Sequence, residues 1–85
     1  MILIVKQDKK ITPHFKIKWK YIMDDNFILL ECIYSEKWEN EINELINNTH
    51  IFDGVFKNYD TYFTLQFSKT NLNNFNSLID SIFDI

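Results

Sequence analysis

Residues 15–34 read FKIKWKYIMDDNFILLECIY, and this stretch decides the fold. In its first half, apolar side chains alternate with three lysines, which is the period of a half-buried strand. A second run rich in strand-forming residues occupies residues 27–34. Between the two runs, Asp25 and Asn26 are residue types that tolerate the left-handed backbone of a tight turn. The stretch therefore predicts a β-hairpin.

A two-residue turn at Asp25 and Asn26 would fix the register of this hairpin. Lys20 would then lie opposite Glu31 on one face, which is a favourable cross-strand pair. The other face would carry apolar pairs only. These pairs are Met23/Ile28, Tyr21/Leu30, Trp19/Cys32 and Ile17/Tyr34.

Thirteen residues of the chain recur 33 positions later, because YSEKWENEINELI (34–46) aligns with FSKTNLNNFNSLI (67–79) at five identical positions. One supersecondary unit is therefore predicted to occur twice. The same register shifted by 33 puts Asn58 and Tyr59 in a second turn, pairs Val55 with Tyr62, and leaves Gly54 at a bulge. The predicted core face carries Phe52, Phe56, Phe63, Leu65 and Phe67, and the outer face carries Asp53, Val55, Tyr62, Thr64 and Gln66.

A serine follows each predicted hairpin and precedes an apolar stripe with helical spacing. Ser35 and Ser68 are expected to cap two helices by accepting hydrogen bonds from first-turn N–H groups. Each helix would bury its stripe on the shared sheet face. The stripes consist of Trp38, Ile42, Leu45 and Ile46, and of Leu72, Phe75, Leu78, Ile79 and Ile82.

The apolar N-terminus completes the predicted architecture. Residues 1–6 are expected to form an extra strand, because residues 1–5 are all apolar. The prediction is a single α+β domain over 1–85, with an antiparallel sheet of about five strands and two helices on one face. Its order is β(ββα)(ββα), with ββα units at 14–47 and 50–83 and an internal repeat of period 33.

Composition narrows the setting of the protein. A single cysteine excludes an internal disulfide, and the apolar start is too short for a signal sequence or a membrane span, so a cytoplasmic location is expected. All nine basic residues are lysine, and ten Asn and thirteen Ile accompany no Ala. This usage is typical of an AT-rich genome, such as that of a low-GC bacterium, its phage or a mobile element.

No residue pattern in the chain indicates catalysis. A single glycine excludes the phosphate-binding loops, and Cys32 with His14 and His50 cannot form a familiar zinc cluster. The predicted register turns Cys32 inward. The carboxylates grouped near the predicted turns are Asp24, Asp25, Asp53 and Asp60, and turn chemistry alone explains the adjacent pair Asp24 and Asp25. We therefore expect no catalytic residue, metal ion, cofactor or small-molecule substrate.

The sheet face without helices is the surface on which we expect a partner to bind. It carries more large apolar groups than a bare solvent face, which favours a protein-binding or self-association surface with a polar rim. The expected role is a binder or inhibitor of a cellular or host-defence protein. The predicted protein-binding residues are Ile22, Leu29, Ile33, Val55 and Tyr62.

Three alternatives stay open for these surfaces. The open sheet face would be a single-stranded nucleic-acid site if Lys16, Lys18 and Lys20 grip phosphates and Tyr62 stacks on bases. The isoelectric point of about 5.2 and the absence of arginine weigh against this alternative. The same face would have no role if another segment covers it. Finally, the acidic helix face would imitate phosphates toward a nucleic-acid-binding protein; its residues are Glu36, Glu39, Glu41 and Glu44.

Overall fold

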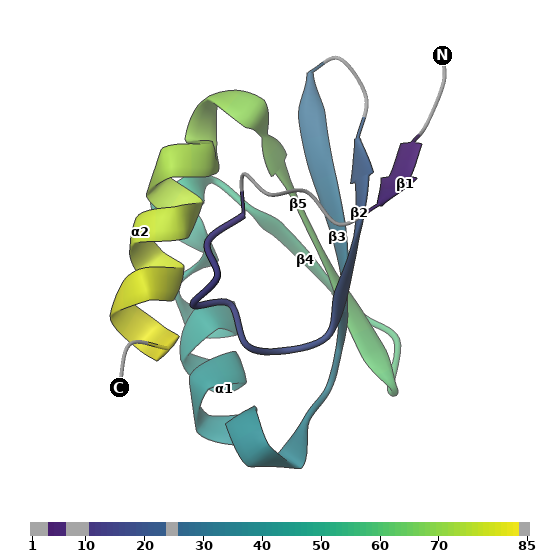
Figure 1. Cartoon of the computed structure of the whole chain (residues 1–85), viewed down its shortest axis with the longest axis vertical. Coiled ribbons are helices and arrows are strands. Elements are labelled where there is room, and N and C mark those ends of the chain that lie inside the picture. The colour runs from purple at the N-terminus through teal and green to yellow at the C-terminus, as the bar shows by residue number, and fades with distance from the viewer. Residues whose placement is uncertain (1–3, 7–10, 24–25, 84–85) are drawn as a thin grey trace.

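Helices cover one face of an antiparallel sheet in the computed structural model, which describes residues 4–6, 11–23 and 26–83 (Figure 1). The strands are β1 (Ile4–Lys6), β2 (Trp19–Met23), β3 (Phe27–Ile33), β4 (Val55–Asn58) and β5 (Tyr62–Ser68). The helices are α1 (Glu39–Asn47) and α2 (Leu72–Phe83). Three short 3₁₀ turns are η1 (Glu36–Trp38), η2 (Thr49–Phe52) and η3 (Lys69–Asn71).

The body of the sheet consists of four strands, contributed by the hairpins β2–β3 and β4–β5. The strand order is β1-β2-β3-β5-β4, so β3 and β5 pair at the centre of the sheet. The other strand of each hairpin, β2 or β4, lies farther toward an edge. The prediction of about five strands is not confirmed in full. In place of a strand over residues 1–6, only the three residues of β1 pair along the edge of β2, and residues 1–3 lie outside the described part.

The predicted register of the first hairpin is confirmed from Trp19 to Met23, whereas the predicted pair Ile17/Tyr34 is not part of the ladder because β2 begins at Trp19. Trp19 lies opposite Cys32 and Lys20 lies opposite Glu31, and the remaining pairs of β2 with β3 follow the same alignment. Of the two predicted turn residues, Asn26 is described, whereas Asp25 lies outside the described residues together with Asp24. Alternating apolar and polar side chains fix this register, because a slip by one residue would turn every buried side chain toward solvent.

The predicted register of the second hairpin is wrong. Asn58 is not a turn residue but pairs with Phe63, and Val55 lies opposite Gln66 instead of Tyr62. The turn comes later, at Tyr59 to Thr61, where Asp60 has the left-handed φ of 67°. The pairing register is shifted by an even number of residues, and an even shift leaves each side chain on the same face of the sheet. The predicted core residues of β5 therefore remain buried.

The internal repeat of period 33 is not confirmed. The helical segments do keep this spacing, since η1 and η3, and also α1 and α2, begin 33 residues apart. The hairpins correspond only after a shift of 35 residues, by which the pair Tyr21↔Leu30 becomes Phe56↔Leu65. The difference of two arises because Tyr34 and Ser35 separate β3 from η1, whereas β5 runs directly into η3.

Residues 11–18 form an irregular segment rather than the first half of a strand. This segment lies on the helix side of the sheet (Figure 1). Its Phe15 ring packs edge-on against Phe75 and Phe83, with centroid distances of 5.6 and 5.8 Å. The backbone N–H of Thr12 donates to Asn76 of α2 over 3.1 Å. Alternating burial thus continues through residues 15–18, although no strand does.

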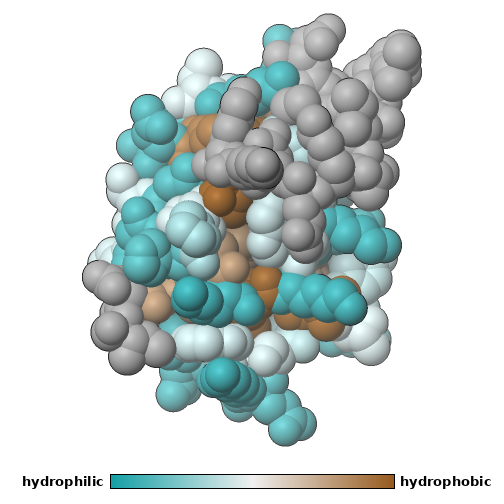
Figure 2. All heavy atoms as spheres, viewed as in Figure 1, coloured by the Kyte–Doolittle hydropathy of each residue, from teal (hydrophilic) through white to brown (hydrophobic). Residues whose placement is uncertain are grey.

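The core lies between the helices, residues 11–18 and one face of the sheet. α1 buries Ile42 and Leu45, and α2 buries Phe75, Ile79 and Phe83. From this side, apolar residues reach the described surface only in narrow patches between hydrophilic ones (Figure 2). The buried apolar residues contributed by the strands, by η2 and by residues 11–18 are Ile11, Phe15, Ile17, Tyr21, Ile28, Leu30, Cys32, Phe52, Phe63, Leu65 and Phe67.

One of the two predicted serine caps is confirmed. The Ser68 hydroxyl accepts a hydrogen bond from the N–H of Thr70 over 3.3 Å at the start of η3. Ser35 precedes η1, but its side chain makes no capping hydrogen bond. Its role as a helix cap was therefore predicted wrongly, although its position in the chain was right.

The single glycine is required by a close contact. Phe52 lies in η2 rather than in a strand, and its ring is fully buried. Asp53 ends η2 with the left-handed φ of 55°, so it belongs to no strand face. A Cβ atom at Gly54 would lie only 2.3 Å from Cε2 of Phe52. Gly54 therefore lets the chain pass the Phe52 ring before β4 begins, and it marks no bulge.

Candidate interaction surface

Three rows of side chains cross the sheet face opposite the helices, which we call the open face. The middle row consists of Lys20, Glu31, Thr64 and Lys57, which lie side by side on β2, β3, β5 and β4. The flanking rows consist of Leu29, Gln66 and Val55, and of Ile33 and Tyr62. Because side chains alternate along each strand, the buried residues between them face the helices.

A hollow of about 220 Å³ lies on the open face between β3, β5 and β4. Thr64 lies within it and is only 8% exposed, although its strand position faces away from the helices. The neighbouring apolar groups are open to solvent, with Ile33 43%, Tyr59 46% and Val55 55% exposed. The residues lining the hollow are Leu29, Glu31, Val55, Lys57, Tyr59, Tyr62, Thr64 and Gln66.

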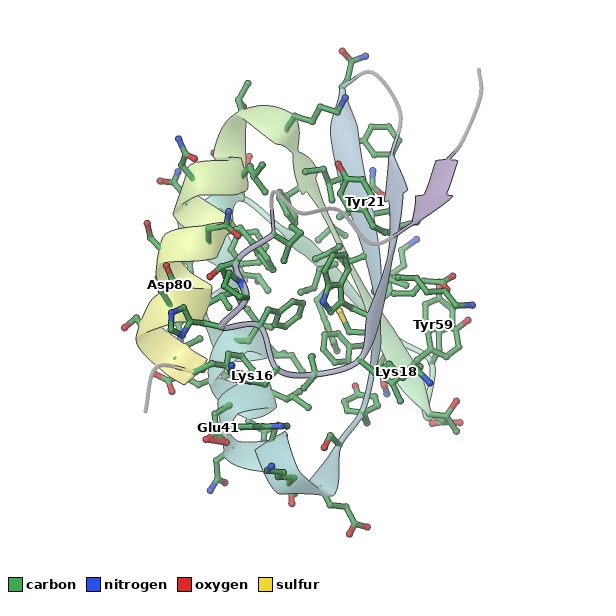
Figure 3. The ribbon with its side chains drawn as sticks, in the orientation of Figure 1. Lys16, Lys18, Tyr21, Glu41, Tyr59 and Asp80 are labelled. Carbon is green, nitrogen blue, oxygen red and sulfur yellow. The ribbon has the colours of Figure 1, made fainter. Side chains whose placement is uncertain are left out.

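Two stacked tyrosines form one wall of the hollow. The rings of Tyr59 and Tyr62 are 4.9 Å apart between centroids and nearly parallel, at 8°. Tyr59 lies on the side of the sheet away from the helices, whereas Tyr21 points toward them (Figure 3). One face of the Tyr62 ring is therefore covered by Tyr59. This contact removes part of the stacking surface that a base would need on Tyr62.

The turn that carries Tyr59 is held by hydrogen bonds. The Asn58 side-chain oxygen accepts from the N–H of Asp60 over 3.3 Å and from the hydroxyl of Tyr34 over 2.7 Å. The N–H of Tyr59 donates to the carbonyl of Tyr62 over 2.9 Å. Burial, and secondarily the charge of Asp60, raise the pKa of Tyr34, so its hydroxyl stays protonated as a donor. The tyrosine wall is thus held by the backbone of β5 and by Tyr34, which follows β3.

The structure brings together four of the five predicted protein-binding residues. Leu29, Ile33, Val55 and Tyr62 share the open face. The fifth, Ile22, lies opposite Leu29 in the backbone ladder, but its side chain lies outside what the structure describes.

The three predicted phosphate-gripping lysines do not form one row. Only Lys20 lies in β2, because the strand begins at Trp19. Lys16 lies on the helix side and Lys18 beside the sheet (Figure 3). The backbone of Lys18 still accepts a hydrogen bond from the N–H of Ile33 over 2.8 Å. The row is broken because the segment before Lys18 lies over the core on the helix side instead of continuing β2.

A second cleft, of about 450 Å³, lies where β3 meets α1. Its lining combines two carboxylates with apolar and polar groups: Tyr34, Ser35, Glu36, Glu39, Ile42 and Asn43. The acidic helix face includes two of these residues. Of its four predicted members, Glu36, Glu39 and Glu44 are exposed and Glu41 is half-buried.

Cys32 is the one described thiol, and it is not placed for chemistry. It is fully buried behind the open face, and burial raises the pKa of its thiol far above the ordinary value. Among residues 4–6, 11–23 and 26–83, no group of three or more His, Cys, Asp or Glu residues converges to hold a metal ion. No helix in the described part is both long and apolar enough to cross a membrane.

Sequence reasoning missed Tyr59 and Lys57 as members of the open face and treated Thr64 as an ordinary outer residue. The missed signal was Asp60, because aspartate adopts the left-handed backbone more readily than most residues and favours turns. A turn centred on Asp60 would have placed Tyr59 next to Tyr62.

No protein-family model, curated protein or solved structure matches this chain. The fold and the open face are therefore interpreted from their own residues.

Proposed function

We propose that this protein is a non-enzymatic interaction domain that binds a protein partner through the open face. The observation that carries the proposal is the exposure of Ile33, Val55 and Tyr59 on one side of the sheet. Exposed apolar groups gathered on one surface are typical of interaction sites, with charged groups at the rim. Lys20 and Lys57 provide such charges at the two ends of the middle row, and Glu31 lies between them.

The mode of action that follows is occupancy of a target surface. The one described thiol is buried and no metal-binding group converges in the described residues, so the domain would act by covering a site on its partner, as an inhibitor of a cellular or host-defence protein would. A phage, a mobile element or a low-GC bacterium would be a suitable source of such a protein. Self-association through the same face is the other form of this proposal.

The proposal is tested by placing a charge in the apolar part of the open face. Ile33→Asp should abolish association with the partner, whether that is a protein captured from the source lysate or a second copy. Ile51→Asp is a matched control, because Ile51 is 45% exposed but lies in η2. The measurements are retention of the captured protein and the mass in solution, with circular dichroism to verify folding.

The outcome distinguishes an apolar interface from the nucleic-acid alternative. An apolar interface should tolerate high salt, whereas phosphate binding weakens steeply with salt and depends on each cation. The proposal would be contradicted if folded Ile33→Asp associated as the parent does while Lys18→Glu with Lys20→Glu lost association.

A further inference from the structure

The middle row of the open face carries two cations, Lys20 and Lys57, and one carboxylate, Glu31. Glu31 lies directly opposite Lys20, and it lines the same hollow as Lys57. At the other end, Lys57 lies opposite the uncharged Thr64. Within the described residues Lys57 forms no ion pair. The hollow is therefore bordered by a positive charge that is available to a ligand.

On the opposite side of the molecule, both helices carry carboxylates and no basic residue, although Lys16 also lies on that side. α1 carries Glu39, Glu41 and Glu44, and α2 carries Asp80, while neither helix has a basic residue in its last turn. The net charge of the chain is −3. An acidic partner is therefore repelled by the helical layer and attracted to the Lys57 side, since complementary charge steers the orientation of encounter.

The hollow has the size and lining for one side chain. Its volume of about 220 Å³ is below the roughly 300–1,000 Å³ of typical small-molecule sites. Leu29 and Val55 supply aliphatic surface, and the Tyr59–Tyr62 stack supplies an aromatic wall. An apolar side chain that enters such a pocket acts as an anchor of an interface.

We propose that the hollow receives an acidic, apolar segment of a protein partner. One apolar side chain packs over Leu29 and Val55, and an adjacent carboxylate pairs with the Lys57 ammonium. This inference rests on the proposed function and specifies the chemistry of the partner. A nucleic-acid strand fits less well, because the middle row offers two cations beside the carboxylate of Glu31 and because Tyr59 covers one face of Tyr62.

Three matched peptides test the inference by NMR titration of the ¹⁵N-labelled protein. The acidic probe is acetyl-GDLDFDG-amide, and its neutral and basic counterparts replace each aspartate by asparagine or lysine. The acidic peptide should bind most tightly and shift the amide signals of Leu29, Lys57 and Thr64. Raising the salt concentration should weaken it, since its charge pair is exposed.

Lys57→Gln should weaken the acidic peptide by about twofold to fivefold, which is the loss expected for one exposed ion pair. Lys16→Gln is the matched control, because Lys16 is exposed on the helix side and should leave affinity unchanged. Both changes are at exposed positions, so both variants should fold.

The other outcomes separate this inference from the proposed function. Equal binding of the neutral peptide, or tighter binding of the basic one, would overturn the acidic partner while leaving an apolar interface in place. Absence of open-face shifts with all three peptides would also overturn the inference, and the Ile33→Asp experiment then decides the proposed function alone. A short oligothymidylate that shifts the same amides more than the peptides do would overturn both.

Discussion

Replacing Gly54 by alanine should destabilise the protein through a collision with a ring that cannot move. The new Cβ would lie 2.3 Å from Cε2 and 2.9 Å from Cδ2 of Phe52, whereas carbon atoms in contact are about 3.5–4.0 Å apart. Phe52 is fully buried and packs edge-on against Phe67 and Phe75, with centroid distances of 5.2 and 5.1 Å. Overpacking costs about 1–3 kcal/mol, and disturbing aromatic pairs adds to it, so we expect a loss of about 2–4 kcal/mol.

Thermal unfolding followed by circular dichroism measures this loss. In a domain of this size, Gly54→Ala should lower Tm by roughly 10–30 °C, at about 4–8 °C per kcal/mol. Ile51→Ala, at an exposed position of the preceding turn, should change Tm little. Adding Phe52→Leu should recover part of the Gly54→Ala loss, because the ring atoms in collision are removed. A Gly54→Ala protein that melts within a few degrees of the parent, or strictly additive losses in the double variant, would refute the reasoning.

Three further predictions concern the thiol, the core and the N-terminal segment. The free energy of unfolding should fall as pH rises above about 9, because burial raises the pKa of Cys32 in the folded state from its ordinary value of 9.0 and the unfolded chain loses this proton first. Cys32→Ala should reduce that slope in urea titrations at several pH values, and an unchanged slope would contradict the assignment. Phe63→Ala should lower the free energy of unfolding by about 3–5 kcal/mol in denaturant titrations, because Phe63 is fully buried. Trp19→Ala should lower it less, because Trp19 is only half-buried, and the reverse order would contradict the burial pattern. Thr12→Val removes the hydroxyl that donates to the Asp80 carboxylate and should cost about 0.5–1.5 kcal/mol in the same assay, whereas an unchanged midpoint would show that this hydrogen bond adds no stability.

The fold was predictable in the strands whose side chains alternate between a buried face and an exposed face. The first hairpin was read correctly because burial on one face and the Lys20/Glu31 pair on the other agree on one register. The same reasoning failed for residues 15–18. Burial alternates there as it would in a strand, because Phe15 packs against α2 and Ile17 is buried in the core. Side-chain alternation alone does not reveal whether the backbone pairs.

The second hairpin and part of the open face were missed for a connected reason. The period of 33, which holds for the helices, was applied to the strands as well. The strands repeat after 35 residues instead, because β5 runs directly into η3 while two residues separate β3 from η1. The period of 33 placed the turn before Asp60, so Tyr59 and Lys57 were not assigned to the open face. Leu29, Ile33, Val55 and Tyr62 were still placed on it, because an even shift leaves the alternation unchanged.

The central position of β3 and β5 also determines how the chain assembles. Each hairpin closes within a short turn, but the pair Leu30↔Leu65 joins residues 35 positions apart. Local hairpins form fast, whereas joining them requires closing a long loop before its contacts contribute, so we expect the docking of the two hairpins to be the slow step of folding. A nascent or cleaved chain that holds only one hairpin would expose β3 or β5 as an unpaired edge. Because such an edge is a template for another chain, we expect partly synthesised copies to exchange strands or aggregate along β3 and β5.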